Sequence, residues 1–203
     1  MASMSTEFIG GRLCLDFANT VDWRRRAEPE ELLPDYLGLV DWSARAGTLL
    51  PTDARRFAAA ARKHPRAAAA AFAKALGLRE AFYRTVLAHA HGETPPEVDL
   101  VQVVYSYAEA VEQARLSVDG ASYEWTFDKS AGDLDRPWWP VVVSAVELLT
   151  SPELARVREC EGQGCGWLFL DESRSRTRRW CSAAGCGNRE RVPESRTVGE
   201  MPG

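Results

Sequence analysis

The sequence predicts a mainly α-helical fold with a small antiparallel β element, in which a multihelical N-terminal domain precedes a small cysteine-rich module. Three observations predict it. Apolar residues recur at three- and four-residue spacing over most of residues 35–150, as they do on one face of a helix. An Asp119-Gly120 pair between two short apolar runs is typical of a β-hairpin. Four of the five cysteines lie between Cys160 and Cys186.

The N-terminal segment, residues 8–20, begins with a glycine pair and continues with an apolar, partly alternating run. This pattern predicts a turn followed by a short strand or extended segment. Pro34 or Asp35 then opens a helix that ends near Gly47, because proline and aspartate favour helix starts and glycine favours helix ends.

The next three helices have recognisable boundaries. Thr52 can cap a helix over residues 53–63, which Pro65 ends. An alanine-rich helix over residues 66–91 follows, since alanine has the highest helix propensity. Residues 97–115 form another helix, with valines, tyrosine and alanines mostly three or four positions apart.

The pattern then changes to a hairpin and returns to helix. Strands over residues 116–118 and 123–127 flank the Asp-Gly turn. Pro137 starts an apolar helix that continues to about Leu149. Ser151-Pro152-Glu153 begins a short further helix, with serine as its cap and proline at its first position.

Charge divides the chain near residue 155. The whole chain has a net charge of −4, but residues 1–155 carry 16 basic and 22 acidic side chains, whereas residues 156–198 carry nine basic side chains, all arginine, and six acidic ones. We therefore predict a helical domain over 1–155, a basic module over 156–198 and a tail over 199–203. No run approaches the ~18 apolar residues of a membrane span, and no secretory signal is visible. The sequence predicts a cytoplasmic protein with no membrane partner.

The cysteines of the C-terminal module are spaced as metal ligands. Cys160 and Cys165 form one pair, and Cys181 and Cys186 form a second pair after fifteen residues. Two such pairs can place four thiolates around one tetrahedral Zn²⁺. Disulfides or free buried thiols are the alternatives, and disulfides are rare in a reducing cytosol. Four cysteines leave no coordination position open, so the Zn²⁺ is predicted to be structural.

The residues around these cysteines resemble the CGNR zinc finger, which is named after its last four residues, here Cys186-Gly187-Asn188-Arg189. The runs over 165–171 and 178–182 also match its pattern. In that family an N-terminal domain called ABATE precedes the finger. Residues 11–20 resemble its start, and residues 138–140 with 147–149 resemble its end. The resemblance implies an ABATE domain followed by a treble-clef-like four-cysteine zinc module. It also implies a role in stress-induced regulation of transcription.

Arginine and hydroxyl residues gather around the second cysteine pair. Arginine forks onto phosphate with two hydrogen bonds, serine and threonine can add another, and asparagine and arginine can read base edges. The residues predicted to contact nucleic acid are Arg174, Arg176, Arg178, Arg179, Asn188, Arg189 and Arg191. The alternative is that Arg179 or Arg189 braces the finger through Asp171 or Glu172, and that Asn188 only completes a turn.

The segment after the last cysteine departs from the family pattern. The family usually continues with a strongly basic tail, whereas here Pro193 interrupts the helix and three glutamates dilute three arginines. The sequence therefore predicts weak DNA affinity for one chain, which dimerisation or another partner would have to strengthen.

Polar residues also cluster in the N-terminal domain. Asp16, Asn19 and Thr20 either cap turns or form a polar patch that binds a small-molecule effector. The Arg24-Arg25-Arg26 run is interpreted as a solvated turn. Cys14 lies among apolar residues and is predicted to be a buried thiol.

Three functions remain open from the residues. The first is a zinc-containing DNA-binding transcription regulator whose N-terminal domain senses an effector or forms a homodimer. The second is an RNA- or protein-interaction module with a purely structural zinc ion. The third is an enzyme in the helical domain, which the lack of a nucleophile motif, a glycine-rich phosphate loop or paired catalytic carboxylates disfavours.

Overall fold

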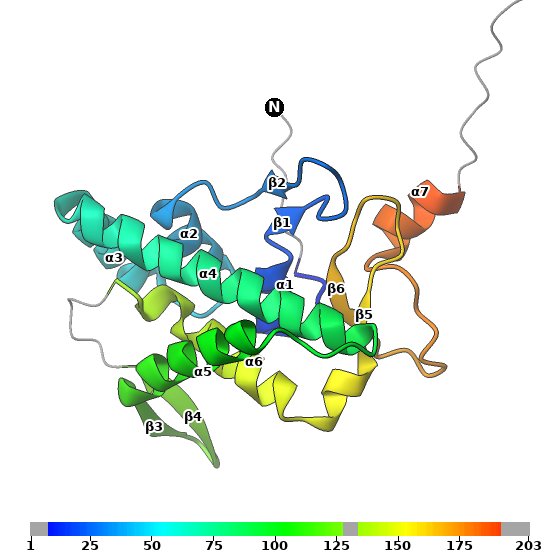
Figure 1. The fold of residues 1–203 in the computed structure, drawn as a ribbon. Coiled ribbons are helices and arrows are strands. Elements are labelled where there is room, and N and C mark those ends of the chain that lie inside the picture. Colours follow the sequence, from blue (N-terminus) through cyan, green and yellow to red (C-terminus); the bar gives the residue numbers. More distant parts are fainter. Residues whose placement is uncertain (1–7, 128–133, 192–203) are drawn as a thin grey trace, which may run out of the picture.

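The structure, a computed structural model, describes residues 8–127 and 134–191. It is mainly helical and contains small antiparallel two-stranded sheets (Figure 1). The predicted fold class is therefore confirmed. None of the helices in these two stretches is both long enough and apolar enough to cross a membrane.

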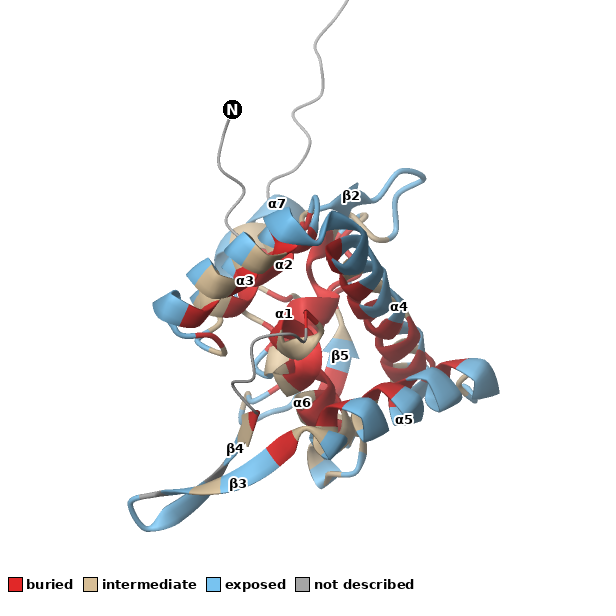
Figure 2. Ribbon diagram, turned by 90° about the vertical axis from the view of Figure 1, so that its left-hand side faces the viewer, coloured by how far each residue is buried: buried red, intermediate tan, exposed pale blue. Residues whose placement is uncertain are grey.

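The N-terminal part consists of helices that pack against the long helix α4, whose outer face is exposed (Figures 1 and 2). The helices that pack around it are α1 (Leu13–Ala18), α2 (Tyr36–Arg45), α3 (Pro51–Lys63), α5 (Glu97–Glu112) and α6 (Trp139–Leu149), and α4 itself spans Pro65–Ala90. Figure 2 shows that the buried residues line the inner sides of these helices. Trp42, Trp138, Trp139 and Phe17 are the largest fully buried side chains of this core.

The prediction of an extended segment over residues 8–20 was wrong. Residues Leu13–Ala18 form helix α1, and the chain becomes extended only at β1 (Val21–Asp22), which pairs with β2 (Glu30–Glu31). The helix lies inside the core with five of its six residues buried. A helix that is buried all round has no polar face, so its sequence cannot be distinguished from that of a buried strand.

Several boundaries differ from the predictions for local reasons. Helix α3 begins at Pro51, with Leu50 rather than Thr52 at its N-cap. Proline fits the first turn because that N–H has no partner in the helix. In the same way, Pro65 begins α4 instead of only ending α3. The predicted short helix after Ser151 is the 3₁₀ helix η2 (Pro152–Arg156), and Ser151 caps it as expected.

The predicted hairpin is present and longer than expected. Strand β3 (Ala114–Asp119) pairs with β4 (Ser122–Phe127) in an antiparallel register that sets Ala114 opposite Phe127 and Asp119 opposite Ser122. Helix α5 consequently ends at Glu112, before residue 115. After β4 a 3₁₀ turn, η1 (Arg136–Trp138), leads into α6.

The C-terminal module is a hairpin followed by a short helix. Strands β5 (Val157–Glu159) and β6 (Leu168–Leu170) are antiparallel, and a π turn, η3 (Ala183–Gly187), precedes α7 (Asn188–Arg191). The module thus has a loop between two paired strands, then a second loop, then the start of a helix. This is the treble-clef-like order that the resemblance implied. The side chains of Leu168 and Leu170 belong to the core of the helical domain.

Candidate metal centre and nucleic-acid interface

The four cysteines come from the two loops of the C-terminal module. Cys160 follows β5 and Cys165 precedes β6, so pairing of the two strands brings them together. The loop between them turns tightly at Gly164, whose φ is +74°, in the region that favours glycine. At Gly162 an added Cβ would lie 2.9 Å from the sulfur of Cys186, so a side chain there would enter the cluster.

The four sulfurs lie close enough together to share one metal ion. All four cysteines are buried, and their Sγ atoms lie within 4.8 Å of one another. The Sγ atom of Cys181 is 3.8 Å from that of Cys165 and 3.7 Å from that of Cys186. Zn–S bonds of about 2.3 Å in a tetrahedron give S···S distances of about 3.8 Å, whereas a disulfide requires about 2.05 Å. The donor set fits one tetrahedral metal ion and does not fit disulfides.

The electrostatics of the cluster favour a cation. Hydrogen bonds with the sulfurs of Cys160 and Cys165, and then burial, raise the pKa of the Cys181 thiol, so forming its thiolate without a cation is costly. A divalent ion removes this cost, since metal binding and thiol deprotonation occur together. Two donors also face the sulfurs: the Cys181 amide lies 3.3 Å from Cys160 Sγ, and the Arg189 guanidinium lies 2.9 Å from Cys186 Sγ.

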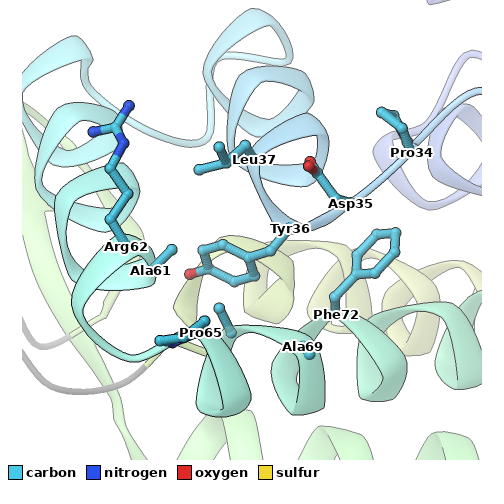
Figure 3. Close-up of a pocket in the computed structure, with 10 residues that line it drawn as sticks. Pro34, Asp35, Tyr36, Leu37, Ala61, Arg62, Pro65, Ala69 and Phe72 are labelled. Atoms are coloured by element: carbon cyan, nitrogen blue, oxygen red, sulfur yellow. The ribbon is translucent and has the colours of Figure 1, made fainter.

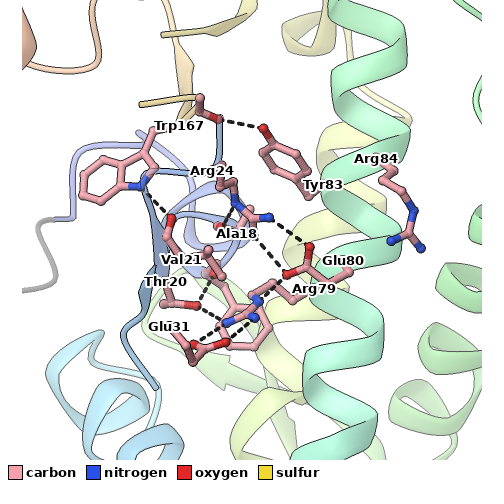
Figure 4. Close-up of polar contacts among 12 residues, drawn as sticks. Ala18, Thr20, Val21, Arg24, Glu31, Arg79, Glu80, Tyr83, Arg84 and Trp167 are labelled. Carbon is pink, nitrogen blue, oxygen red and sulfur yellow. Dashed lines mark hydrogen bonds and ion pairs between the residues drawn. The ribbon is translucent and has the colours of Figure 1, made fainter. Parts of the chain in front are cut away.

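The module is docked onto the helical domain by hydrogen bonds to backbone groups. The side chain of Asn19 donates to the carbonyl of Leu168 at 2.8 Å and accepts from its amide at 2.9 Å. The amide of Arg24 donates to the carbonyl of Cys165 at 3.0 Å. The Trp167 indole donates to Val21, and the Tyr83 hydroxyl donates to Gly166 (Figure 4). Residues 160–168, which carry the first cysteine pair and are called the metal loop below, are thus attached directly to the helical domain.

Ion pairs of the buried Arg79 on α4 hold residues 19–31, the docking segment. The Arg79 guanidinium donates to both carboxylate oxygens of Glu31 at 2.8 and 2.6 Å, to Thr20 at 2.9 Å and to Glu80 at 2.8 Å. Arg24 also reaches Glu80, so both arginines converge on one carboxylate (Figure 4). The prediction of a solvated turn was therefore wrong for Arg24, whose side chain is 7% exposed.

Sequence reasoning missed Arg79, although a signal exists. Arg79 stands four residues after Ala75, three before Phe82 and seven before Val86, on the stripe that α4 buries. An arginine in an apolar stripe at helical spacing indicates a buried charge with a partner.

The three residues predicted to bind an effector all have hydrogen-bond partners within the protein. Asp16 accepts from the Gly10 amide at 2.7 Å, Asn19 holds Leu168, and Thr20 donates to the carbonyl of Phe17 at 2.7 Å. All three are buried. These contacts favour the alternative in which they fix turns and the docking segment.

A cavity of about 260 Å³ lies elsewhere, between α2, α3 and the start of α4 (Figure 3). Tyr36, Leu37 and Phe72 line it, and Arg62 stands at its edge. It is slightly smaller than the ~300–1,000 Å³ typical of ligand pockets, and none of the three predicted effector residues lines it.

Burial of Asp16 gives a testable pH dependence. Desolvation raises the pKa of Asp16 from 3.8 to about 6. The folded state therefore binds this proton more tightly than the unfolded state, and the associated stability is present below pH 4 and lost as the pH rises through 6.

Asp16→Asn keeps an oxygen for the Gly10 amide and removes the titration. Between about pH 4 and 7 the wild type should lose up to about 3 kcal/mol relative to the variant, measured by urea unfolding. Parallel profiles for the two proteins would contradict this assignment.

The predicted nucleic-acid residues divide into two groups. Three of them are engaged within the module. Arg178 covers the Phe169 ring at 4.5 Å and donates to the carbonyls of Trp180 and Cys181. Arg179 pairs with Glu161 at 2.6 Å, rather than with Asp171 or Glu172. Arg189 contacts Cys186 and stacks 4.5 Å from the ring of Trp23.

The second group lacks such partners. Arg174, Arg176 and Asn188 are exposed, and their side chains have no hydrogen-bonding or ionic partner among the described residues. The buried carboxylate of Asp171 fixes the loop that carries the two arginines, because it accepts hydrogen bonds from the backbone amides of Ser173 and Arg178. The side chain of Arg191 and the predicted stop at Pro193 lie outside the described residues.

Comparison with known proteins gives two family matches. Residues 11–152 match the ABATE family, described as "Putative stress-induced transcription regulator", and residues 156–197 match the CGNR zinc finger. Neither description is an enzyme class. No curated protein matches the chain. The ABATE match covers most of the 203 residues and the finger match includes all four clustered cysteines. The chain therefore belongs to the ABATE family and carries a CGNR zinc finger.

Proposed function

We propose that this protein is a DNA-binding transcription regulator, that Cys160, Cys165, Cys181 and Cys186 hold a structural Zn²⁺, and that the loop around Arg174 and Arg176 contacts the phosphate backbone. The observation that carries the proposal is the exposure of these two arginines, without partners among the described residues, on a loop anchored beside the metal cluster. The family description supports regulation of transcription, with the helical domain in the regulatory role.

Zinc is the metal that the donor set favours. Four thiolates in tetrahedral arrangement select zinc or iron–sulfur chemistry, and a structural zinc site takes four cysteines without an open position. The ion would neutralise the thiolates and hold the two loops together. In a module of this size the free energy of metal binding supplies folding energy that a small apolar core cannot.

The exposed loop has the chemistry of a phosphate contact. Each arginine can place two donors on one phosphate, and Ser175 and Thr177 stand between and after them with their hydroxyls 2.8 Å apart. Arg178 is two residues away, yet it faces the protein interior and supports the loop instead. We therefore assign phosphate binding to Arg174 and Arg176 and a bracing role to Arg178 and Arg189.

The salt dependence of duplex binding tests this assignment. The Arg174→Ala/Arg176→Ala double variant should keep its zinc and its fold, because neither side chain has a hydrogen-bonding or ionic partner among the described residues. Each lost phosphate contact lowers the slope of log K against log salt by about 0.9, so the slope should fall by about 1.8. Fluorescence anisotropy with a labelled duplex between about 50 and 200 mM salt measures it.

A charge-matched variant provides the control. Arg55→Ala/Arg66→Ala removes two exposed arginines from α3 and α4 and so lowers the net charge of the chain equally. Its slope should equal that of the wild type. The same slope for all three proteins would exclude Arg174 and Arg176 from the interface, and a wild-type affinity that does not change with salt would exclude phosphate-driven binding altogether.

A further inference from the structure

The β3–β4 hairpin carries an apolar face that only partly belongs to the core. Side chains alternate between the two faces of a strand, so the register sets three apolar pairs on one face: Ala114 with Phe127, Leu116 with Trp125, and Val118 with Tyr123. The first pair is buried, and Phe127 packs 5.6 Å from Trp139. The other two pairs continue the same face beyond the core.

These two outer pairs are open to solvent. Leu116 is 61% exposed, Val118 72%, Tyr123 74% and Trp125 43%. The hairpin projects from the helical layer in both views, and its tip is the part farthest from the core (Figures 1 and 2). The opposite face carries polar side chains such as Arg115, Ser117 and Thr126. The alternation is therefore strict, and the apolar side is the one left uncovered.

The uncovered area is large for a single chain. From their exposed fractions, the four outer side chains leave roughly 500 Å² of surface uncovered, near the upper end of what monomers expose in one patch. Helix α5, which ends two residues before β3, adds a second exposed stripe of Val98, Val101, Val104 and Tyr105. The hairpin patch alone is smaller than the ~800 Å² per partner of a standard interface, so the contact that it can make is a weak one.

The other segments of this chain cannot cover such a face. Residues 1–7, 128–133 and 192–203 lie outside the described residues and contain no leucine, isoleucine or aromatic side chain. The face itself carries no charged side chain, so it does not suit nucleic acid or another charged partner. An apolar face of matching size is required, and a two-fold axis provides one by setting two identical faces against each other.

We propose that two copies of this chain associate face to face through the outer half of the β3–β4 hairpin, with Val118, Tyr123 and Trp125 at the centre of the contact. Aromatic side chains are the usual anchors of such interfaces. The hairpin and the C-terminal module lie in separate parts of the molecule in both views (Figures 1 and 2). The dimer therefore leaves both cysteine clusters and both arginine loops uncovered.

Sedimentation velocity of the zinc-loaded full chain, without DNA, tests the proposal. The wild type should pass from one chain to two between about 1 and 100 µM. Val118→Lys and Tyr123→Lys place a charge on the face at exposed positions, and each should raise the dissociation constant at least tenfold. Leu50→Lys, at a position of similar exposure outside the hairpin, should behave as the wild type.

Two results would overturn the proposal. One is a wild-type chain that remains a monomer at about 100 µM, which would leave the face to another partner protein. The other is a wild-type dimer that both lysine variants retain, which would place the contact elsewhere. Circular dichroism of each variant confirms that the fold is intact. Because DNA is absent, a negative result leaves the proposed DNA binding untouched.

Discussion

Replacing Cys181 with serine is expected to abolish metal binding, unfold the C-terminal module and destabilise the helical domain. Cys181 contacts two other sulfurs of the cluster, so its loss breaks the tetrahedron. Structural zinc contributes roughly 10–16 kcal/mol of apparent binding free energy in small zinc modules. The few buried side chains of this module cannot replace a contribution of that size.

The effect should extend to the helical domain because the two parts share a core. Leu168 and Leu170 are buried among helical residues, and burial of such side chains contributes about 1.5–3 kcal/mol each. Loss of several kcal/mol should lower the melting temperature of the helical domain by about 10 °C. Hydrogen exchange should show new exposure in β6 and in the docking segment around Asn19.

Cys14→Ser is the matched control for this prediction. Cys14 is equally buried, but it lies in α1 and donates to the carbonyl of Ser144 rather than facing the cluster. Its variant should retain one metal ion per chain by elemental analysis. A Cys181→Ser chain that also retains one metal ion and melts like the wild type would contradict the four-cysteine site.

Arg79→Ala is expected to cost about 3 kcal/mol of stability, the second largest effect. Its guanidinium is 4% exposed and satisfies Glu31, Glu80 and Thr20 at once. Removing it takes away the ion pair of Glu31 and leaves Glu80 with Arg24 alone. It also releases the segment whose amide at Arg24 holds the metal loop, so the zinc module should loosen as well.

Urea unfolding of three variants measures this effect. Arg66→Ala, on the same helix but exposed, should change the unfolding free energy by less than about 0.5 kcal/mol. Arg79→Lys keeps the charge but loses the bidentate contact with Glu31. Its loss of unfolding free energy should therefore lie between the losses of the two alanine variants. Equal losses of unfolding free energy in Arg79→Ala and Arg66→Ala would show that the ion pairs of Arg79 do not stabilise the docking segment.

The cysteine cluster could be predicted from sequence because metal coordination imposes its own spacing. Two pairs with short gaps are typical of a four-ligand metal site, and the structure places Cys160 and Cys186 in one cluster as expected. The hairpin was predictable for a similar reason, since a turn and two alternating runs are local features.

The roles of individual arginines could not be predicted in this way. Arg176 and Arg178 are two positions apart in one basic run, yet one faces solvent and the other covers Phe169. Their difference arises from Asp171, which fixes the loop, and from the buried ring. Composition gives the charge of a segment but not the direction of each side chain.

Docking of the two parts was equally hidden in the sequence. Asn19 and Leu168 are 149 residues apart, and their paired hydrogen bonds leave no periodic pattern. Helix α1 was missed because it is surrounded by the core. Both features depend on contacts between distant segments, which propensity and spacing do not encode.

DNA binding by the arginine loop is tested most directly by selection from a mixed random pool of duplex DNA and structured RNA at one stated salt concentration. Zinc-loaded wild type and the Arg174→Ala/Arg176→Ala variant are compared side by side. The wild type is expected to enrich duplex DNA, and the variant to enrich it far less. Enrichment of RNA, or equal enrichment of duplex DNA by both proteins, would contradict the proposed role of this loop.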